Sequence, residues 1–293
     1  MGSRMPLVAM LVAVEIAIVG IAVYALTGHH TIFASGTPGF DGFRQVNYTA
    51  PSFAPLAVGS GPTIAIDDPS DRVIVTASND RFVHVVDRTQ VRGNFWGSPH
   101  IAPLRFDRNA NGVTISRAED SEFVGFGFES VTRRIEVQVP SDAALAIARC
   151  GGAEVSGVTG GVTAHSVDGS ILLADLHGAV DVRDDDGRIE ARRIVGDTFS
   201  ARSNDGRIIL DGVVSPKIDV NTLDGRIIAT FPSDSDATIM ARTNDGNIIR
   251  DGTLLNHGDG DAASQTLTLG SGSAKVAMAT DDGTITIFTN GAN

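Results

Sequence analysis

Residues 203–210 read Ser-Asn-Asp-Gly-Arg-Ile-Ile-Leu, and residues 222–229 repeat the pattern as Thr-Leu-Asp-Gly-Arg-Ile-Ile-Ala. The Asp-Gly pair recurs in one register six times, with its glycines 18, 19, 19, 21 and 37 residues apart. A period of this length is typical of a repeat architecture. The pairs are Asp168 and Gly169, Asp186 and Gly187, Asp205 and Gly206, Asp224 and Gly225, Asp245 and Gly246, and Asp282 and Gly283.

Apolar and polar residues alternate on both sides of each pair. The second residue after every glycine is isoleucine, and the residues five and seven before it are apolar. A period of two predicts strands with one buried face. Asp-Gly predicts a turn between them, since Gly accepts positive φ and Asp can bond its own backbone. The isoleucines expected in the core are Ile171, Ile189, Ile208, Ile227, Ile248 and Ile285.

The repeat length favours a solenoid over a series of hairpins. Asp-Gly is also a hairpin signal, so a β-sandwich or a barrel of hairpins is the alternative. In a solenoid, equivalent residues stack about 4.8 Å apart on successive coils, which explains why each position keeps one residue type. We therefore expect an all-β fold, a right-handed parallel β-solenoid with coils of about 19 residues. The expected hand follows from the general preference of parallel crossovers.

The regular Asp-Gly-x-Ile units predict a solenoid over residues 141–293. Residues 57–140 also alternate, but out of register, and we expect them to form a β-rich cap or irregular first coils. A solenoid needs a cap because its last coil otherwise exposes an open strand edge. The final glycine spacing is near twice the unit, which indicates a coil without its marker or with a loop at residues 257–261.

The N-terminal segment, residues 1–28, is expected to be a membrane anchor. Leu7 to Leu26 is apolar apart from Glu15, and a helix of this length spans about 30 Å, the thickness of the hydrocarbon core. Arg4 precedes the run and no Lys or Arg follows it before residue 44. The positive-inside bias then predicts a single-pass protein with a cytoplasmic N-terminus. A cleaved signal peptide is the alternative.

Beyond the anchor, residues 29–56 hold several Gly and Pro without periodicity and predict a linker. The β domain would then be extracytoplasmic, in the periplasm or at the cell surface. The formal charge of −12, from 35 acids and 23 bases, disfavours a nucleic-acid partner. A single cysteine excludes an internal disulfide and a Cys-rich zinc site.

Few residues suggest chemistry. We predict no catalytic residues, no cofactor and no metal site. The weak metal candidates are Asp184, Asp185 and Asp186, because Ca²⁺ takes several oxygen ligands. The alternative interpretation of the Asp-Gly pairs is a column of turn residues, which we favour.

The sequence resembles a known bacterial family. Ile135 to Pro140 reads Ile-x-Val-x-Val-Pro, Gly151 and Gly152 follow, and then come the serial Asp-Gly-x-Ile units. This order is similar to the DUF4097 "putative adhesin" β-strand-repeat family, related to head-GIN-like bacterial β-solenoid domains. The resemblance covers residues 64–288 apart from 88–104, which look like an insertion. It implies an envelope-facing β-solenoid, often behind a membrane anchor, and carries no established catalytic residues.

These features together predict a non-catalytic, membrane-anchored and envelope-exposed adhesin-like protein. Its expected partners are the membrane, through the N-terminal helix, and a protein or glycan at the cell surface. One alternative is a structural or envelope-stress component that associates with other membrane proteins. A second is a polysaccharide-active solenoid enzyme.

Overall fold

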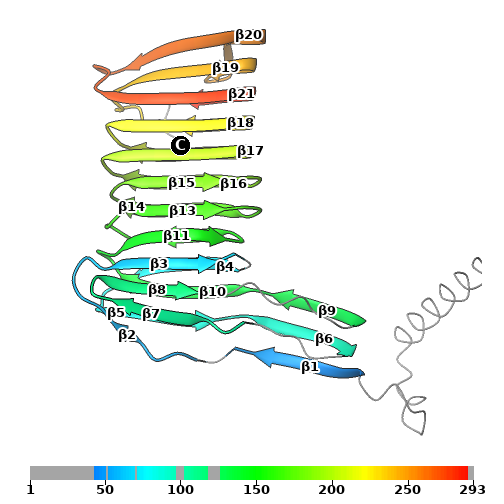
Figure 1. The fold of residues 1–293 in the computed structure, drawn as a ribbon. Coiled ribbons are helices and arrows are strands. Elements are labelled where there is room, and N and C mark those ends of the chain that lie inside the picture. Colours follow the sequence, from blue (N-terminus) through cyan, green and yellow to red (C-terminus); the bar gives the residue numbers. More distant parts are fainter. Residues whose placement is uncertain (1–42, 51, 70, 97–101, 118–125, 290–293) are drawn as a thin grey trace, which may run out of the picture. The chain divides into compact units, whose positions relative to one another are not determined.

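The computed structural model describes residues 43–50, 52–69, 71–96, 102–117 and 126–289, which form strands, turns and connections (Figure 1). Within these ranges no helix could cross a membrane. The predicted anchor at residues 7–26 lies outside them. The chain divides into two compact units. The described residues of the smaller unit belong to a three-stranded sheet of β1 (Phe43–Thr49), β6 (Gln90–Trp96) and β9 (Phe126–Thr132), with β6 in the middle.

The larger unit is a stack of mainly parallel strands, which confirms the predicted all-β solenoid (Figure 1). From β17 onward, one long strand continues through each Asp-Gly turn. The strands are β2 (Leu56–Ala57), β3 (Thr63–Asp68), β4 (Arg72–Ser78), β5 (Phe82–Asp87), β7 (Arg105–Asn109), β8 (Gly112–Ser116), β10 (Arg134–Pro140), β11 (Ala144–Cys150), β12 (Ala153–Ser156), β13 (Val162–Ser166), β14 (Ser170–His177), β15 (Val180–Asp184), β16 (Arg188–Val195), β17 (Thr198–Val214), β18 (Lys217–Thr230), β19 (Ala237–Arg250), β20 (Thr253–Leu269) and β21 (Ala274–Phe288).

Equivalent residues of successive coils pair in register. Ile208 of β17 pairs with Ile227 of β18, which pairs in turn with Ile285 of β21. All six isoleucines two residues after the turn glycines are fully buried. The residue after five of these, such as Ile228, is only half-buried because the pleat turns it outward, whereas Glu190 after Ile189 is buried. The core of the stack is therefore built from columns of identical or similar side chains.

The order of coils in the stack departs from the order in the chain at both ends. The C-terminal strand β21 pairs with β18 on one side and β19 on the other, so it lies between two strands that are consecutive in sequence. Near the other end, β3 lies between β8 and β11, and β4 lies between β10 and β12. Residues 63–78, expected in a cap or irregular coils, therefore form a coil of the parallel stack.

Each end of the stack carries antiparallel strands. At the C-terminal end β20 runs antiparallel to β19, and at the other end β5 and β7 run antiparallel to β10 and β8. Residues 257–261, expected to be a loop, belong to β20, so that prediction was wrong. The long glycine spacing arises because this whole strand reverses direction and has no Asp-Gly turn in register. Because the outer strands run in the reverse direction, they do not present the parallel edge on which another coil could stack.

Candidate functional site

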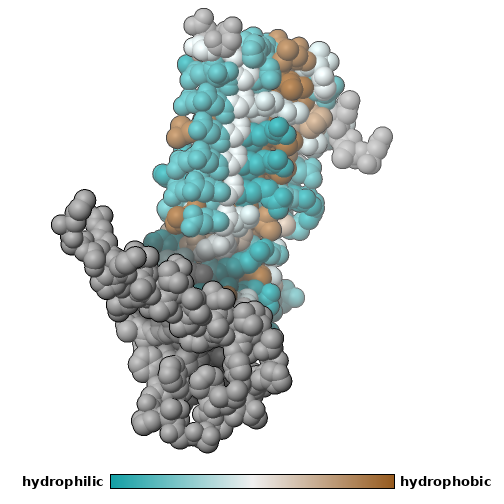
Figure 2. Space-filling model, turned by 90° about the vertical axis from the view of Figure 1, so that its right-hand side faces the viewer, coloured by the Kyte–Doolittle hydropathy of each residue, from teal (hydrophilic) through white to brown (hydrophobic). Residues whose placement is uncertain are grey.

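The Asp-Gly turns form one edge of the stack. Asp205, Asp224 and Asp282 lie on neighbouring strands in register, as do the glycines that follow them. Viewed from the right-hand side of Figure 1, hydrophilic residues lie on both sides of a pale stripe along the stack (Figure 2). This edge is polar and regular. Whether it could bind a ligand or catalyse a reaction depends on which side chains the neighbouring turns bring together.

The turn glycines are required by the neighbouring coil. A Cβ atom on Gly206 would overlap the carbonyl oxygen of Gly187, and one on Gly225 would overlap that of Gly206. Neither Gly206 nor Gly225 has a positive φ, whereas Gly246 and Gly283 do. The sequence-based reason, freedom of φ, thus applies to the last coils, while close backbone approach explains the middle ones.

Threonine hydroxyl groups inside the turns bind neighbouring coils. The buried residue three before five of the six glycines is Ser166, Ser203, Thr222, Thr243 or Thr280, and these residues are called the hydroxyl ladder. Thr222 Oγ1 donates to the carbonyl oxygen of Asn204 at 3.2 Å, and Thr280 Oγ1 donates to that of Leu223 at 3.1 Å. These bonds satisfy turn carbonyls that the strands leave unpaired, so the hydroxyls have a structural role.

Asp184 replaces a hydroxyl residue in this ladder. It pairs in register with Ser166 and Ser203 and is fully buried. Burial raises the pKa of its carboxyl from 3.8 to about 6, and the neighbouring charges of Asp185 and Asp186 add to the rise. A buried carboxyl with this pKa is largely ionised at neutral pH and lies where other coils have a neutral donor.

The three predicted metal candidates do not converge. Asp184 is buried inside the turn, Asp185 is half-buried and Asp186 is exposed. Asp185 accepts hydrogen bonds from Arg183. Among the described residues, no group of three or more His, Cys, Asp or Glu side chains could hold a metal ion.

We accordingly expect the stability of the protein to be independent of calcium. Ca²⁺ at 100 times its dissociation constant would stabilise the folded state by about 2.7 kcal/mol, a clear shift in melting temperature. A thermal melt with EDTA and one with millimolar Ca²⁺ should therefore coincide. A reproducible rise with Ca²⁺ would show that carboxylates of the turn edge bind the ion.

A buried ionic cluster lies elsewhere in the stack and was missed in the sequence. Arg117 bonds to Asp68 at 3.0 Å, to Asp71 at 3.1 Å and to Asp87 at 2.7 Å, and all four side chains are buried. Burial and the charge of Asp68 raise the pKa of Asp71 to about 7, although Arg117 opposes the rise. The cluster joins the β3–β4 turn to the ends of β5 and β8. No local pattern could reveal it, because its members come from separate strands.

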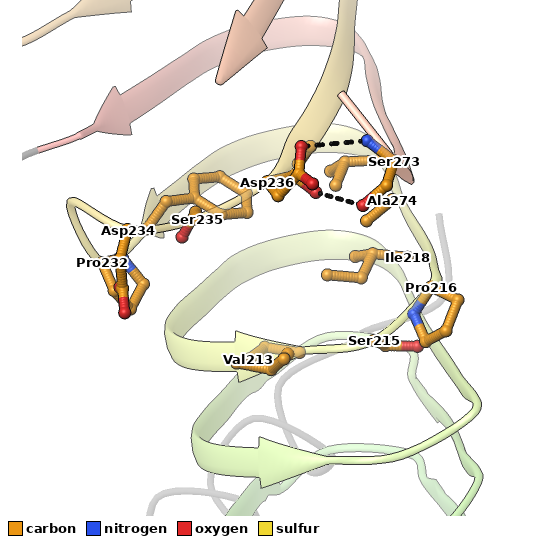
Figure 3. Close-up of a pocket in the computed structure, with 14 residues that line it drawn as sticks. Val213, Ser215, Pro216, Ile218, Pro232, Asp234, Ser235, Asp236, Ser273 and Ala274 are labelled. Carbon is orange, nitrogen blue, oxygen red and sulfur yellow. Dashed lines mark hydrogen bonds between the residues drawn. The ribbon is translucent and has the colours of Figure 1, made fainter. Parts of the chain in front are cut away.

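A pocket of about 590 Å³ opens where the chain passes from β18 to β19 (Figure 3). This connection has to pass β21, which lies between the two strands. Val213, Ile218 and Phe231 contribute apolar walls. Asp236 accepts hydrogen bonds from the Ser271 hydroxyl at 2.7 Å and the Ser273 amide at 3.1 Å, which lower the pKa of its carboxyl to about 2. Asp236 thus holds the β20–β21 turn against this connection.

Three arginines line up on the sheet that follows the Asp-Gly turns. Arg188, Arg207 and Arg226 occupy successive coils in register, and all are exposed. Ile209 and Ile228, two positions further along their strands, also pair in register and are half-buried. These five residues are called the arginine face. Arg188 lies 3.5 Å from Glu190, whereas neither Arg207 nor Arg226 forms an ion pair within the described part of the chain.

The cysteine gives no support to nucleophilic chemistry. Cys150 is fully buried, and its thiol donates to the carbonyl oxygen of His165 at 3.4 Å. Burial raises the pKa of the Cys150 thiol. A reactive thiolate needs a lowered pKa and access to its target, so Cys150 is suited to packing.

The chain was compared with known protein families, curated proteins and solved structures. No curated protein matches the chain. Three solved structures are similar to it: a "putative cell adhesion protein" from Clostridium sporogenes (8% identity, 84% of this chain and 99% of that one, TM-score 0.38), a "putative adhesin" from Bacteroides fragilis (13%, 86% and 100%, 0.33) and a "putative adhesin" from Parabacteroides merdae (10%, 85% and 97%, 0.27). A family model described as Toastrack DUF4097 matches residues 151–288, from Gly151 through the last Asp-Gly unit. Residues 151–288 therefore match the Toastrack DUF4097 family, in agreement with the resemblance of their repeats.

Proposed function

We propose that this protein is a non-catalytic, adhesin-like solenoid that binds a surface partner through a lateral face of its stack. The observation that carries the proposal is the in-register display of outward side chains on successive coils, above all Arg188, Arg207 and Arg226. Antiparallel strands at both ends leave the lateral faces as the regular surfaces. A partner with a repeating structure can contact equivalent residues on several coils of such a face at once.

The titratable groups of the stack support binding better than catalysis. Asp184 and the carboxylates around Arg117 are buried, and Cys150 is buried as well. General acid–base and nucleophilic chemistry both need a group within reach of substrate. The exposed carboxylates of the turn edge instead lie in one repeated column, each flanked by a glycine.

Our proposal also places the solenoid outside the cytoplasm. It is supported by the apolar run at residues 7–26 and by Arg4 on its N-terminal side. In this topology the helix remains as a single-pass anchor, and residues after it lead to the β domain. Cleavage of the segment as a signal peptide would release the same domain on the same side of the membrane.

Protease accessibility tests this topology. Protease added to the outer side of the inner membrane, in spheroplasts where an outer membrane exists, should digest the chain beyond about residue 36. An anchor fragment should remain with the membrane. If the β domain stayed intact until the membrane was dissolved with detergent, the proposed topology would be wrong.

Binding to isolated cell envelopes tests the function. The full chain in detergent micelles should sediment with envelopes of the producing cells and reach saturation as its concentration rises. An unrelated single-span protein in the same micelles provides the control. Equal retention of the two proteins would contradict the proposed binding function.

A further inference from the structure

The arginine face is locally basic on an acidic protein. The chain has a formal charge of −12. On β16, Glu190 forms ion pairs with both Arg188 and Arg192, so one carboxylate lies between two cations. On the next two coils, the outward position equivalent to Glu190 is isoleucine. Arg207 and Arg226 therefore keep their charge available for an external anion.

We propose that the arginine face binds an acidic polysaccharide, a polymer of uronic acid units that runs along the stack. This inference rests on the proposed binding function and names the chemistry of its partner. Guanidinium groups bind carboxylates through paired hydrogen bonds, and a weakly hydrated guanidinium loses less on desolvation than an ammonium. Arg207 and Arg226 would bind carboxylates of the same polymer chain.

The spacing of the coils disfavours an extended acidic polypeptide as the partner. Neighbouring strands are about 4.8 Å apart, so Arg188, Arg207 and Arg226 repeat at that interval. Alternate side chains of an extended polypeptide are instead roughly 6.6 Å apart, which loses register within three coils.

The aliphatic residues of the face suit the body of a sugar ring. Ile209 and Ile228 are half-buried, so the exposed part of each side chain forms a small apolar surface beside Arg207 and Arg226. The C–H groups of a pyranose can pack on such a surface while the carboxylate reaches the guanidinium. Asp205 and Asp224 lie on the other side of the turn glycines and repel anions. A bound polyanion is thus confined to the side of the turn that carries Arg207 and Arg226.

Polygalacturonate is the probe that tests this assignment. Immobilised polygalacturonate should bind the full chain in detergent micelles, whereas neutral dextran should not. The double substitution Arg207→Gln and Arg226→Gln should weaken binding at least about tenfold. The control substitutions Arg183→Gln and Arg202→Gln remove two exposed charges from the strands that precede the turns. They should change the affinity for polygalacturonate less than about twofold. Circular dichroism should show unchanged folding in both variants.

Three outcomes would overturn the assignment. Equal loss of polygalacturonate binding in the two double variants would indicate that binding depends only on the net charge of the protein and not on the arginine face. Binding of poly-L-glutamate as tight as that of polygalacturonate would indicate an acidic polypeptide or a general polyanion. No binding of polygalacturonate by protein that still sediments with envelopes would reject this ligand and leave the binding function standing, whereas loss of both would reject the function itself.

Discussion

Replacing Ile227 with alanine should cost about 2–5 kcal/mol of the free energy of unfolding. The Ile227 side chain is fully buried and lies between Ile208 and Ile285, its register partners on the adjacent strands. Alanine would remove three carbon atoms from the buried column. The neighbouring side chains cannot fill the space fully, because hydrogen bonds between strands fix the backbones that carry them. The cost combines lost transfer free energy with a residual cavity.

The adjacent residue provides the matched control. Ile228 is half-buried on the outer face, so Ile228→Ala should cost about 1 kcal/mol or less. The same ordering should hold one coil earlier, for Ile208 and Ile209. Chemical denaturation of the chain in detergent micelles, followed by circular dichroism, measures all four variants. Greater losses at Ile209 and Ile228 would mean that the pleat is inverted by one residue.

Replacing Asp184 with serine should stabilise the protein at pH 7 by up to about 3 kcal/mol. Serine is the residue at this ladder position in the coils on both sides, Ser166 and Ser203. The folded-state pKa of Asp184, about 6, lies above its ordinary value of 3.8. The folded protein therefore holds a proton that the unfolded chain releases, and stability falls as pH rises from about 4 to about 6.

The pH dependence separates this effect from packing. The difference in stability between Asp184→Ser and the native chain should be small at pH 4 and largest at pH 7. Asp71, with a pKa of about 7, also makes stability fall as pH rises, but it does so equally in the native chain and in Asp184→Ser. Asp181→Ser, an exposed change on the same strand, should shift stability by under about 0.5 kcal/mol at either pH. Parallel pH curves, or a destabilised Asp184→Ser at pH 7, would contradict the account of Asp184.

Local sequence periodicity was enough to predict the strands, the turns and the buried face. Ile227 and Ile228 differ in burial as alternation requires, and the Asp-Gly units stack as coils. The family resemblance is confirmed over residues 151–288. The right-handedness of the coils stays a prediction, as do the membrane anchor and the 29–56 linker, although β1 begins at Phe43.

Stack order could not be predicted, because it depends on contacts between distant segments. Each strand has the same alternation whether its neighbour is the preceding strand or one from the end of the chain. β21 carries the Asp-Gly-x-Ile pattern of the other coils, and only its pairing shows that it separates β18 from β19. β20 lacks the pattern, so the sequence alone does not show that this segment is a reversed strand and not a loop.

The candidate site was only partly visible in the sequence. The Asp-Gly-Arg-Ile units at Arg188, Arg207 and Arg226 can be read directly. The pairing of Arg188 with Glu190, which leaves the next two arginines without an ion pair in the described part of the chain, requires side-chain positions. The Arg117 cluster likewise joins residues up to 49 positions apart.

In-register stacking with β21 inserted is tested most directly by disulfide trapping on the outward face. Arg226 of β18 pairs with Thr284 of β21, and Asn247 of β19 pairs with Thr284 on its other side. Neighbouring strands are about 4.8 Å apart, so Arg226→Cys with Thr284→Cys should form a disulfide under mild oxidation. Positions 226 and 247 are two strands apart, roughly 9.6 Å, beyond the reach of a disulfide. Cross-linking of 226 to 284 but not to 247 is the expected result, and cross-linking of 226 to 247 instead would show that the coils stack in chain order.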